Sequence, residues 1–175
     1  MREDEEEEMG EHDHGCPGAR MMDLRGASSA AAAEDGSAGG APSAGIPSEL
    51  RQWPVQLHLV NPGAPYFKGA DVLLTADCVA YAMGGFHPQH LKGKSLAIAC
   101  PKLDDGQEVY VEKVRAWIDD AGIDTLTVMI MQVPCCGELL AMAQRAAQAA
   151  TRKVPVKSVV VSLQGEILRE EWVAV

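Results

Sequence analysis

Two adjacent thiols, Cys135 and Cys136, stand where an apolar run gives way to a helical pattern. The run covers 125–131 and the helical pattern covers 139–150. The first turn of a helix leaves backbone N–H groups unpaired and carries a partial positive charge, so it favours a thiolate and can hydrogen-bond a sulfur ligand. Gly137 lets the chain turn closely past a bound group. We therefore expect both thiols at the carboxyl edge of a sheet, with the lower pKa at Cys136.

Two further cysteines occupy equivalent places in the pattern. Cys78 closes the run 72–77, and Cys100 closes the run 96–99. If the three runs are parallel strands of one sheet, their carboxyl ends share one edge and the four thiols meet there. The sequence has 5 cysteines in all. An odd count in a reducing compartment is typical of metal ligands or redox thiols rather than of a disulfide framework.

Four thiolates within reach of one another form a soft-ligand site suited to an iron–sulfur cluster or to zinc. Zinc sites usually show spaced cysteine pairs, and no C-x2-C pair occurs here. The first hypothesis is therefore an iron–sulfur cluster in electron transfer, with zinc as the alternative metal. In a further alternative, Cys135 and Cys136 alone form a thiol-redox centre, and Cys78 and Cys100 pack as small apolar side chains. The pattern leaves open whether the protein is an enzyme.

Two other side chains are candidate ligands. Cys16 follows His12 and His14 within five positions, but a flexible linker separates this group from the sheet, so we expect Cys16 to be dispensable. His87 precedes His90 by three residues in a predicted loop, and either imidazole could face the thiols. Carboxylates near the strand ends are explained more simply as helix caps and solvated turns: Asp77, Asp104 and Asp105.

The charge is concentrated at the N-terminus. Residues 1–48 hold 11 Asp and Glu against 3 Arg, whereas 49–175 are nearly balanced. A carboxylate run and a Gly/Ala/Ser-rich stretch cannot bury apolar area, so 1–48 is predicted to be a disordered acidic tail and linker, and 49–175 the folded domain. No basic patch supports nucleic-acid binding. No apolar run is long enough for a membrane span, which favours a cytoplasmic protein.

Apolar periodicity predicts the order β, β, short α, β, α, β, α, β within the domain. The strands are expected at 55–59, 72–76, 95–99, 125–132 and 159–163. A short helix is expected at 79–83; a second is capped near Asp105 and ended by Gly122, and a third follows Cys136. This order fits right-handed crossovers and therefore a three-layer α/β fold with a mainly parallel, open sheet of about five strands and helices on both faces.

Several short segments together carry a resemblance that covers about residues 50–168. They are Gln52-Trp53-Pro54-Val55-Gln56-Leu57, Asp77-Cys78-Val79-Ala80-Tyr81-Ala82, Phe86-His87, Leu91-Lys92-Gly93-Lys94, Ala99-Cys100-Pro101-Lys102-Leu103-Asp104-Asp105 and Val133-Pro134-Cys135-Cys136-Gly137. In combination they resemble the C-terminal module of 4Fe-4S ferredoxin-like, iron–sulfur cluster-binding oxidoreductases of anaerobes. The Cys-Cys-Gly element is more loosely similar to the cysteine-rich domains of heterodisulfide reductases.

The resemblance implies a cluster bound by Cys78, Cys100, Cys135 and Cys136, and a redox protein as partner. Members of that kind also carry an N-terminal ferredoxin unit with C-x2-C-x2-C-x3-C-P runs, which this sequence lacks. What the resemblance carries over is therefore the cysteine-bearing module alone. No oligomeric state is implied.

Overall fold

The computed structural model describes residues 17–25 and 46–175. The strands are β1 (Met22–Asp23), β2 (Gln52–Trp53), β3 (Asp71–Ala76), β4 (Ser95–Ala99), β5 (Thr125–Met131), β6 (Val156–Val161) and β7 (Ile167–Val173). The α-helices are α1 (Val79–Ala82), α2 (Gln107–Asp119) and α3 (Gly137–Ala149). Shorter helical turns are Pro17–Ala19, Pro65–Phe67, the π-helical turn His87–Leu91 and the 3-10 turn Pro134–Cys136.

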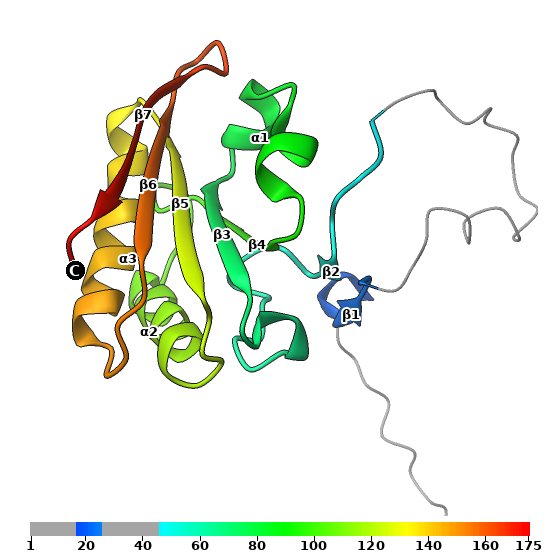
Figure 1. The fold of residues 1–175 in the computed structure, drawn as a ribbon, viewed down its shortest axis with the longest axis vertical. Coiled ribbons are helices and arrows are strands. Elements are labelled where there is room, and N and C mark those ends of the chain that lie inside the picture. The colour runs from blue at the N-terminus through cyan, green and yellow to red at the C-terminus, as the bar shows by residue number, and fades with distance from the viewer. Residues whose placement is uncertain (1–16, 26–45) are drawn as a thin grey trace, which may run out of the picture.

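The main sheet has the strand order β4-β3-β5-β6-β7 (Figure 1). β4, β3, β5 and β6 are parallel, and β7 is antiparallel to β6. The chain runs from β3 to β4 on one side and returns to β5 on the other side of β3, so strand order reverses between β3 and β5. In open α/β sheets this reversal lies where ligands bind, beyond the carboxyl ends of the strands.

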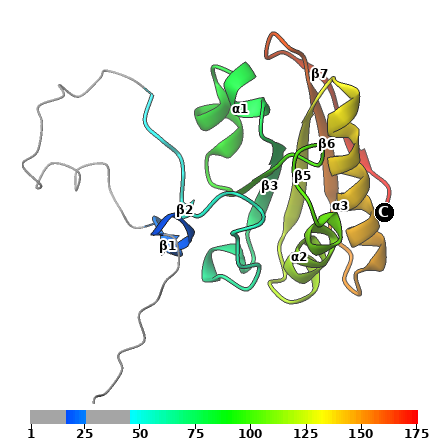
Figure 2. The same ribbon diagram turned by 180° about the vertical axis from the view of Figure 1, so that it is seen from behind.

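The helices form layers on both faces of the sheet. α2 and α3 lie side by side on one face, and α1 with the π-helical turn lies on the other (Figure 2). The inward faces of α2 and α3 are apolar at helical spacing, since Tyr110, Val114 and Trp117 are buried in α2 and Ala143 and Ala146 in α3. The predicted three-layer, mainly parallel architecture is confirmed.

The central strands are buried because apolar side chains fill both of their faces. Every residue of β3 except Asp71 is buried, as are Val128, Met129, Ile130 and Met131 in β5. This pattern is typical of a parallel strand covered by helices on both sides. Burial on both faces fixes the register of β3 and β5, and therefore the positions of the turns that follow them.

The predicted first strand at 55–59 forms only a rudiment. One parallel bridge joins Gln56 to Ile98, where the Ile98 N–H donates to Val55 O (2.8 Å) and the Leu57 N–H donates to Ile98 O (2.9 Å). The chain then turns, and the ammonium of Lys113 on α2 donates to the carbonyls of Leu57, His58 and Val60 at 2.7–2.8 Å. The apolar alternation at 55–59 therefore belongs to this anchored turn and not to a full strand.

Three further predictions about elements were wrong in detail. Residues 86–91 form a π-helical turn rather than a loop. α2 has Gly106 at its N-cap, with φ 68° and no side-chain cap, in place of the predicted Asp105 cap. The last predicted strand begins earlier, at Val156, and the antiparallel β7 was not predicted.

Part of the N-terminal stretch contacts the domain. β1 pairs antiparallel with β2, and the Trp53 indole N–H donates to Gly18 O at 2.6 Å. The Gln52 side chain is fully buried and bonds both the N–H and the C=O of Leu96 in β4. This two-stranded ribbon therefore sits beside the β4 edge (Figure 1). Its pairing was not predicted; the rest of the predicted tail, 1–16 and 26–45, lies outside the described residues.

Candidate functional site

The three central strand ends place four cysteines at one edge of the sheet. Cys100 follows β4 directly, Cys78 lies two residues after β3, and Cys135 and Cys136 lie in the turn between β5 and α3. β4, β3 and β5 are neighbours in the sheet, and Ala76 pairs with Ala99 at the last position of β3 and β4. The predicted convergence of strand ends is therefore present in the backbone.

The adjacent thiols differ in their contact with solvent. The ladder of β5 ends at Met131, as expected before the cysteines, and the 3-10 turn Pro134–Cys136 then leads into α3. Cys135 is exposed to solvent. Cys136, at the N-cap position of α3, is buried and keeps only 6% of its surface exposed. Cys135 and Cys78 are both close enough to act electrostatically on Cys136.

The predicted lowering of the Cys136 pKa is wrong. Burial raises the pKa of the Cys136 thiol, because an apolar environment penalises the thiolate more than the thiol, and the neighbouring Cys135 and Cys78 add to this effect. A backbone hydrogen bond at Met131 acts in the opposite direction but is weaker. The helix N-terminus therefore does not by itself activate this thiol.

Cys100 is held by a different group of side chains. Asp104 accepts a hydrogen bond from the Cys100 backbone N–H (2.8 Å) and another from the Tyr110 hydroxyl (2.7 Å), both at Oδ2. Burial, and then this hydrogen bond, raise the pKa of Tyr110. Cys100 lies in a turn, and these two hydrogen bonds attach that turn to Tyr110 of α2. Sequence reasoning missed this role, since the pattern explained Asp104 as a helix cap or a solvated turn.

Asp77 lies between the thiols and a neighbouring pocket. Burial, and then the nearby Asp104 carboxylate, raise the pKa of Asp77. Its Oδ1 atom is buried and has no hydrogen-bond partner among the residues that the structure describes. A buried acceptor without a partner is costly, which marks Asp77 as more than a solvated turn residue.

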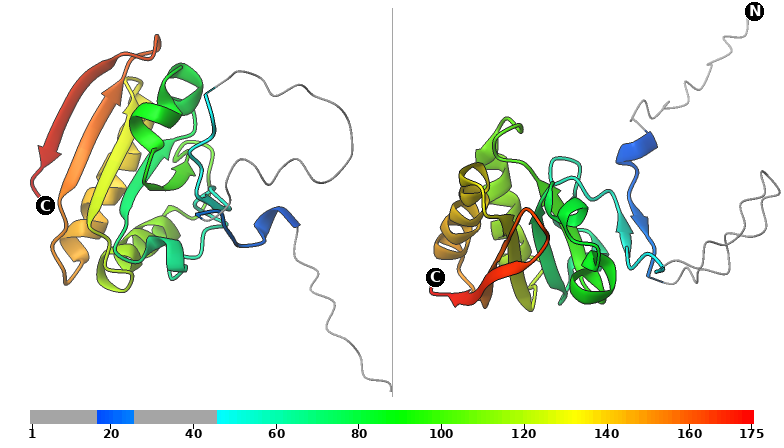
Figure 3. Two further views of the ribbon diagram at one scale, coloured as in Figure 1. Left: turned by 45° about the vertical axis from the view of Figure 1, so that its right-hand side comes forward. Right: turned by 90° about the horizontal axis from the view of Figure 1, so that it is seen from above.

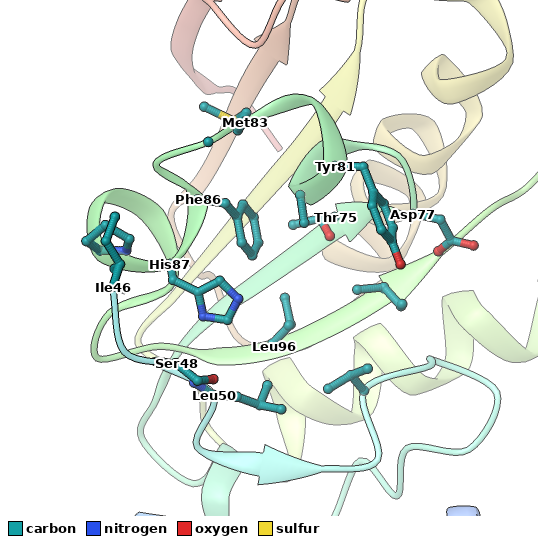
Figure 4. Close-up of a pocket in the computed structure, with 15 residues that line it drawn as sticks. Ile46, Ser48, Leu50, Thr75, Asp77, Tyr81, Met83, Phe86, His87 and Leu96 are labelled. Atoms are coloured by element: carbon teal, nitrogen blue, oxygen red, sulfur yellow. The ribbon is translucent and has the colours of Figure 1, made fainter. Parts of the chain in front are cut away.

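The pocket encloses about 660 Å³, within the range of small-molecule sites (Figure 4). It is lined mainly by apolar side chains of β4, α1, the π-helical turn and 46–55, together with the polar Thr75 of β3, Asp77 and His87. His87 accepts a hydrogen bond at Nδ1 from the Glu49 N–H (3.1 Å), and Figure 4 shows its ring directed into the pocket. Because Nδ1 accepts this bond, the proton of the neutral His87 imidazole lies on Nε2, which can donate to a bound molecule. None of the four cysteines lines the pocket.

The described residues contain no group of three or more His, Cys, Asp or Glu side chains arranged so that it could hold a metal ion. The cysteines thus share an edge of the sheet without forming such a group. Of the two further candidates, His87 points into the pocket, and Cys16 lies outside the described residues. The segment that orients His87 was predicted to be a loop and is a π-helical turn.

Residues 64–175 match the family model described as a Rossmann-like domain, and the chain belongs to that family. A protein of Archaeoglobus fulgidus with the printed name "Uncharacterized protein" is 28% identical over 119 residues, which cover 68% of this chain and 83% of that protein. No solved structure matches the chain. In the described ranges, no helix is long and apolar enough to cross a membrane.

Proposed function

We propose that the protein is an iron–sulfur protein of electron transfer, with a 4Fe-4S cluster bound by Cys78, Cys100, Cys135 and Cys136. The supporting observation is that three adjacent parallel strands each deliver cysteine to the same edge, at the reversal of strand order. These four are the only cysteines of residues 17–175. Cysteines that only packed as small apolar side chains would not need to gather at one edge.

The donor chemistry fits a cluster, although the thiols are not grouped in advance. Four soft thiolates are the usual ligand set of a 4Fe-4S cluster. The described residues contain no ready group of three donors, so binding requires the turns after β3, β4 and β5 to close on the cluster. Such coupling of ligand rearrangement to binding is common in metal sites. When bound, the cluster would supply reversible one-electron transfer.

The surrounding residues have roles that follow from their contacts. Asp104 and Tyr110 fix the turn that carries Cys100. The buried position of Cys136 keeps water from one side of the site, and the exposed Cys78 and Cys135 leave the other side open to a redox protein. Short-range electron transfer needs such an open side, so we infer a docking partner there. Free thiols of this kind require a reducing compartment, and we infer a cytoplasmic location.

The test is anaerobic reconstitution with iron and sulfide, followed by iron and sulfide analysis and visible absorbance. We expect about four irons per chain, the content of one such cluster, and loss of a stable cluster on Cys→Ser at each of the four sites. Cys16→Ser is the matched control and is expected to retain the cluster; His87→Ala is expected to alter only its potential or stability. Protein that binds neither iron nor sulfide under these conditions would overturn the proposal.

The second candidate is a thiol-redox centre at Cys135 and Cys136. It is favoured by the position of these two thiols in one turn, one exposed and one buried, because an accessible thiol beside a second thiol is the arrangement of a redox pair. In this case one pair of thiols per chain titrates reversibly with oxidant, and Cys78→Ser and Cys100→Ser leave that titration unchanged. Zinc in place of iron in the same metal analysis would indicate a zinc-binding module.

A further inference from the structure

β7 is an edge strand that is open to solvent on both faces. It lies at the end of the sheet, beyond β6 (Figure 3). Six of its seven residues are exposed, and the seventh, Val173, is half-buried. Within the described residues its only strand partner is β6. Alternate N–H and C=O groups of such a strand face outward without a ladder partner, and they form a template for another strand.

The side chains of β7 protect this edge only in part. Natural edges carry charges, most often lysine, or proline or a bulge; β7 has no lysine or proline, but it carries Arg169, Glu170 and Glu171 and one register irregularity. It exposes three large apolar side chains, Ile167 (41%), Leu168 (56%) and Trp172 (61%). The ladder with β6 is regular from Val173 to Arg169 but skips Leu168, because Val160 pairs with Arg169 and Val161 pairs with Ile167. The residues from Arg169 to Val173 therefore remain available for regular pairing.

The order of side chains along β7 is self-complementary about Glu170, the middle residue of the strand. In an antiparallel pair of identical strands centred there, Arg169 stands opposite Glu171 of the second copy. Opposite charges therefore meet twice. Shifting the centre to Arg169 would place Arg169 opposite Arg169, and shifting it to Glu171 would place Glu170 opposite Trp172. Of these three registers, only the central one pairs opposite charges.

The faces of the strand agree with this register. The side chains of Arg169 and Glu171 share a face, since Arg169 Nε lies 3.4 Å from Glu171 Oε1 in one chain. Residues directly opposite in an antiparallel pair also share a face, with Cβ atoms about 5 Å apart. The four charges of two chains can therefore form one alternating cluster. Glu170 and Trp172 alternate onto the other face by strand periodicity.

The one unfavourable contact in this register is compensated within each chain. Glu170 would stand opposite Glu170 of the second copy, and like charges directly opposite are destabilising. However, Lys157 Nζ lies 2.6 Å from Glu170 Oε1 and also lies 4.9 Å above the Trp172 ring. Each carboxylate thus brings its own counter-charge to the contact, and Lys157 stays on the same face as Trp172.

We propose that β7 binds β7 of a second copy of this chain, antiparallel and about a two-fold axis at Glu170, so that two five-stranded sheets join into one. The interface is isologous, as expected of a closed dimer. The thiols after β3, β4 and β5 remain separate in each copy. A single strand pair buries less than the roughly 1,200 Å² of a standard interface, so the dimer dissociates in the micromolar range.

Charge-swap variants of the full chain test this register. Sedimentation velocity across a micromolar concentration series measures the dimer of the wild type. Arg169→Glu alone and Glu171→Arg alone each turn two attractive pairs into two repulsive pairs, and should raise the dimer Kd at least about tenfold. The double variant Arg169→Glu/Glu171→Arg restores opposite charges across the axis, and should recover the wild-type Kd to within about threefold. Unchanged far-UV circular dichroism confirms folding.

Three outcomes would overturn the proposal. The first is a wild-type chain that stays monomeric throughout the concentration series. The second is a dimer that both single swaps leave intact, because the two copies would then meet through another surface. The third is a double variant as weak as the single ones, since the effect would then come from loss of a side chain rather than from pairing across the axis. Trp172→Gln, which keeps all charges, should weaken the dimer in the same assay.

Discussion

Replacing Lys113 by Met should lower stability by about 2–3 kcal/mol. The half-buried ammonium donates to three backbone carbonyls, and two of these bonds, to Leu57 and Val60, are partly shielded from water. Each charge-assisted bond contributes about 1.5 kcal/mol at the low end of its range, whereas the exposed bond to His58 adds little. Met retains the packing of the lysine stem, so the change isolates the loss of the ammonium.

The expected shift in melting temperature follows from the size of the domain. Unfolding entropy is roughly 2.1 cal/mol/K per residue, or about 0.27 kcal/mol/K for some 130 residues, so Tm should fall by about 7–11 °C. Thermal and urea unfolding followed by far-UV circular dichroism measure this loss. Hydrogen exchange should also rise at the Leu59 and Val60 amides, which donate to Gln56 O within the anchored turn.

Lys102→Met is the matched control for this experiment. Lys102 is exposed, and no hydrogen bond of its side chain occurs in the described residues. We expect its Tm to stay within about 2 °C of the wild type, as for most surface substitutions. If Lys113→Met unfolded at the same temperature as this control, the ammonium would not anchor the turn and the reasoning from its three contacts would fail.

Three shorter predictions concern the thiols, one glycine and pH. In metal-free protein, iodoacetamide should alkylate the exposed Cys135 well before the buried Cys136, and mass spectrometry after short pulses checks the order; equal rates would contradict the burial. Gly165→Ala should lower stability by at least about 2 kcal/mol, because φ is 85° and a Cβ would overlap the carbonyl of the residue that ends α1. The control Gly137→Ala, which adds a Cβ in open space at the start of α3, should raise stability by about 0.5–1 kcal/mol, and urea unfolding measures both. Burial lowers the pKa of His90 below its ordinary 6.5, so the unfolded chain takes up the proton first as the pH falls. The contribution of His90 to stability is therefore complete above pH 6.5 and is lost as the pH drops toward the folded pKa. His90→Gln should flatten the fall of Tm in this window, and an unchanged slope would exclude His90 as the cause of that fall.

The central part of the fold could be predicted because burial leaves a clear record in the sequence. The strands β3 and β5 are apolar on both faces, and the cysteines follow at their carboxyl ends. β7 could not be predicted in the same way, since both of its faces are exposed to solvent and its sequence lacks apolar alternation. Its stability comes mainly from the ladder with β6, which a short hairpin supplies.

The environment of the candidate site was harder to predict than its position. Sequence spacing places Cys136 beside a helix N-terminus, but it does not reveal that the side chain turns inward, and desolvation then reverses the expected pKa shift. Asp104 likewise has the position of a cap, yet its carboxylate binds Cys100 and Tyr110 across the turn. Such contacts depend on the rotation of single side chains, which periodicity does not determine.

The wall of the pocket beside Asp77 divides the family into a shared and a variable part. Ile46, Ser48, Leu50 and Val55 line the pocket, but they precede residues 64–175, the part matched by the family model. The family match therefore covers one side of this pocket, β3, β4 and α1, and leaves out the side that closes it. A relative that shares only the matched part can differ in the shape of this pocket.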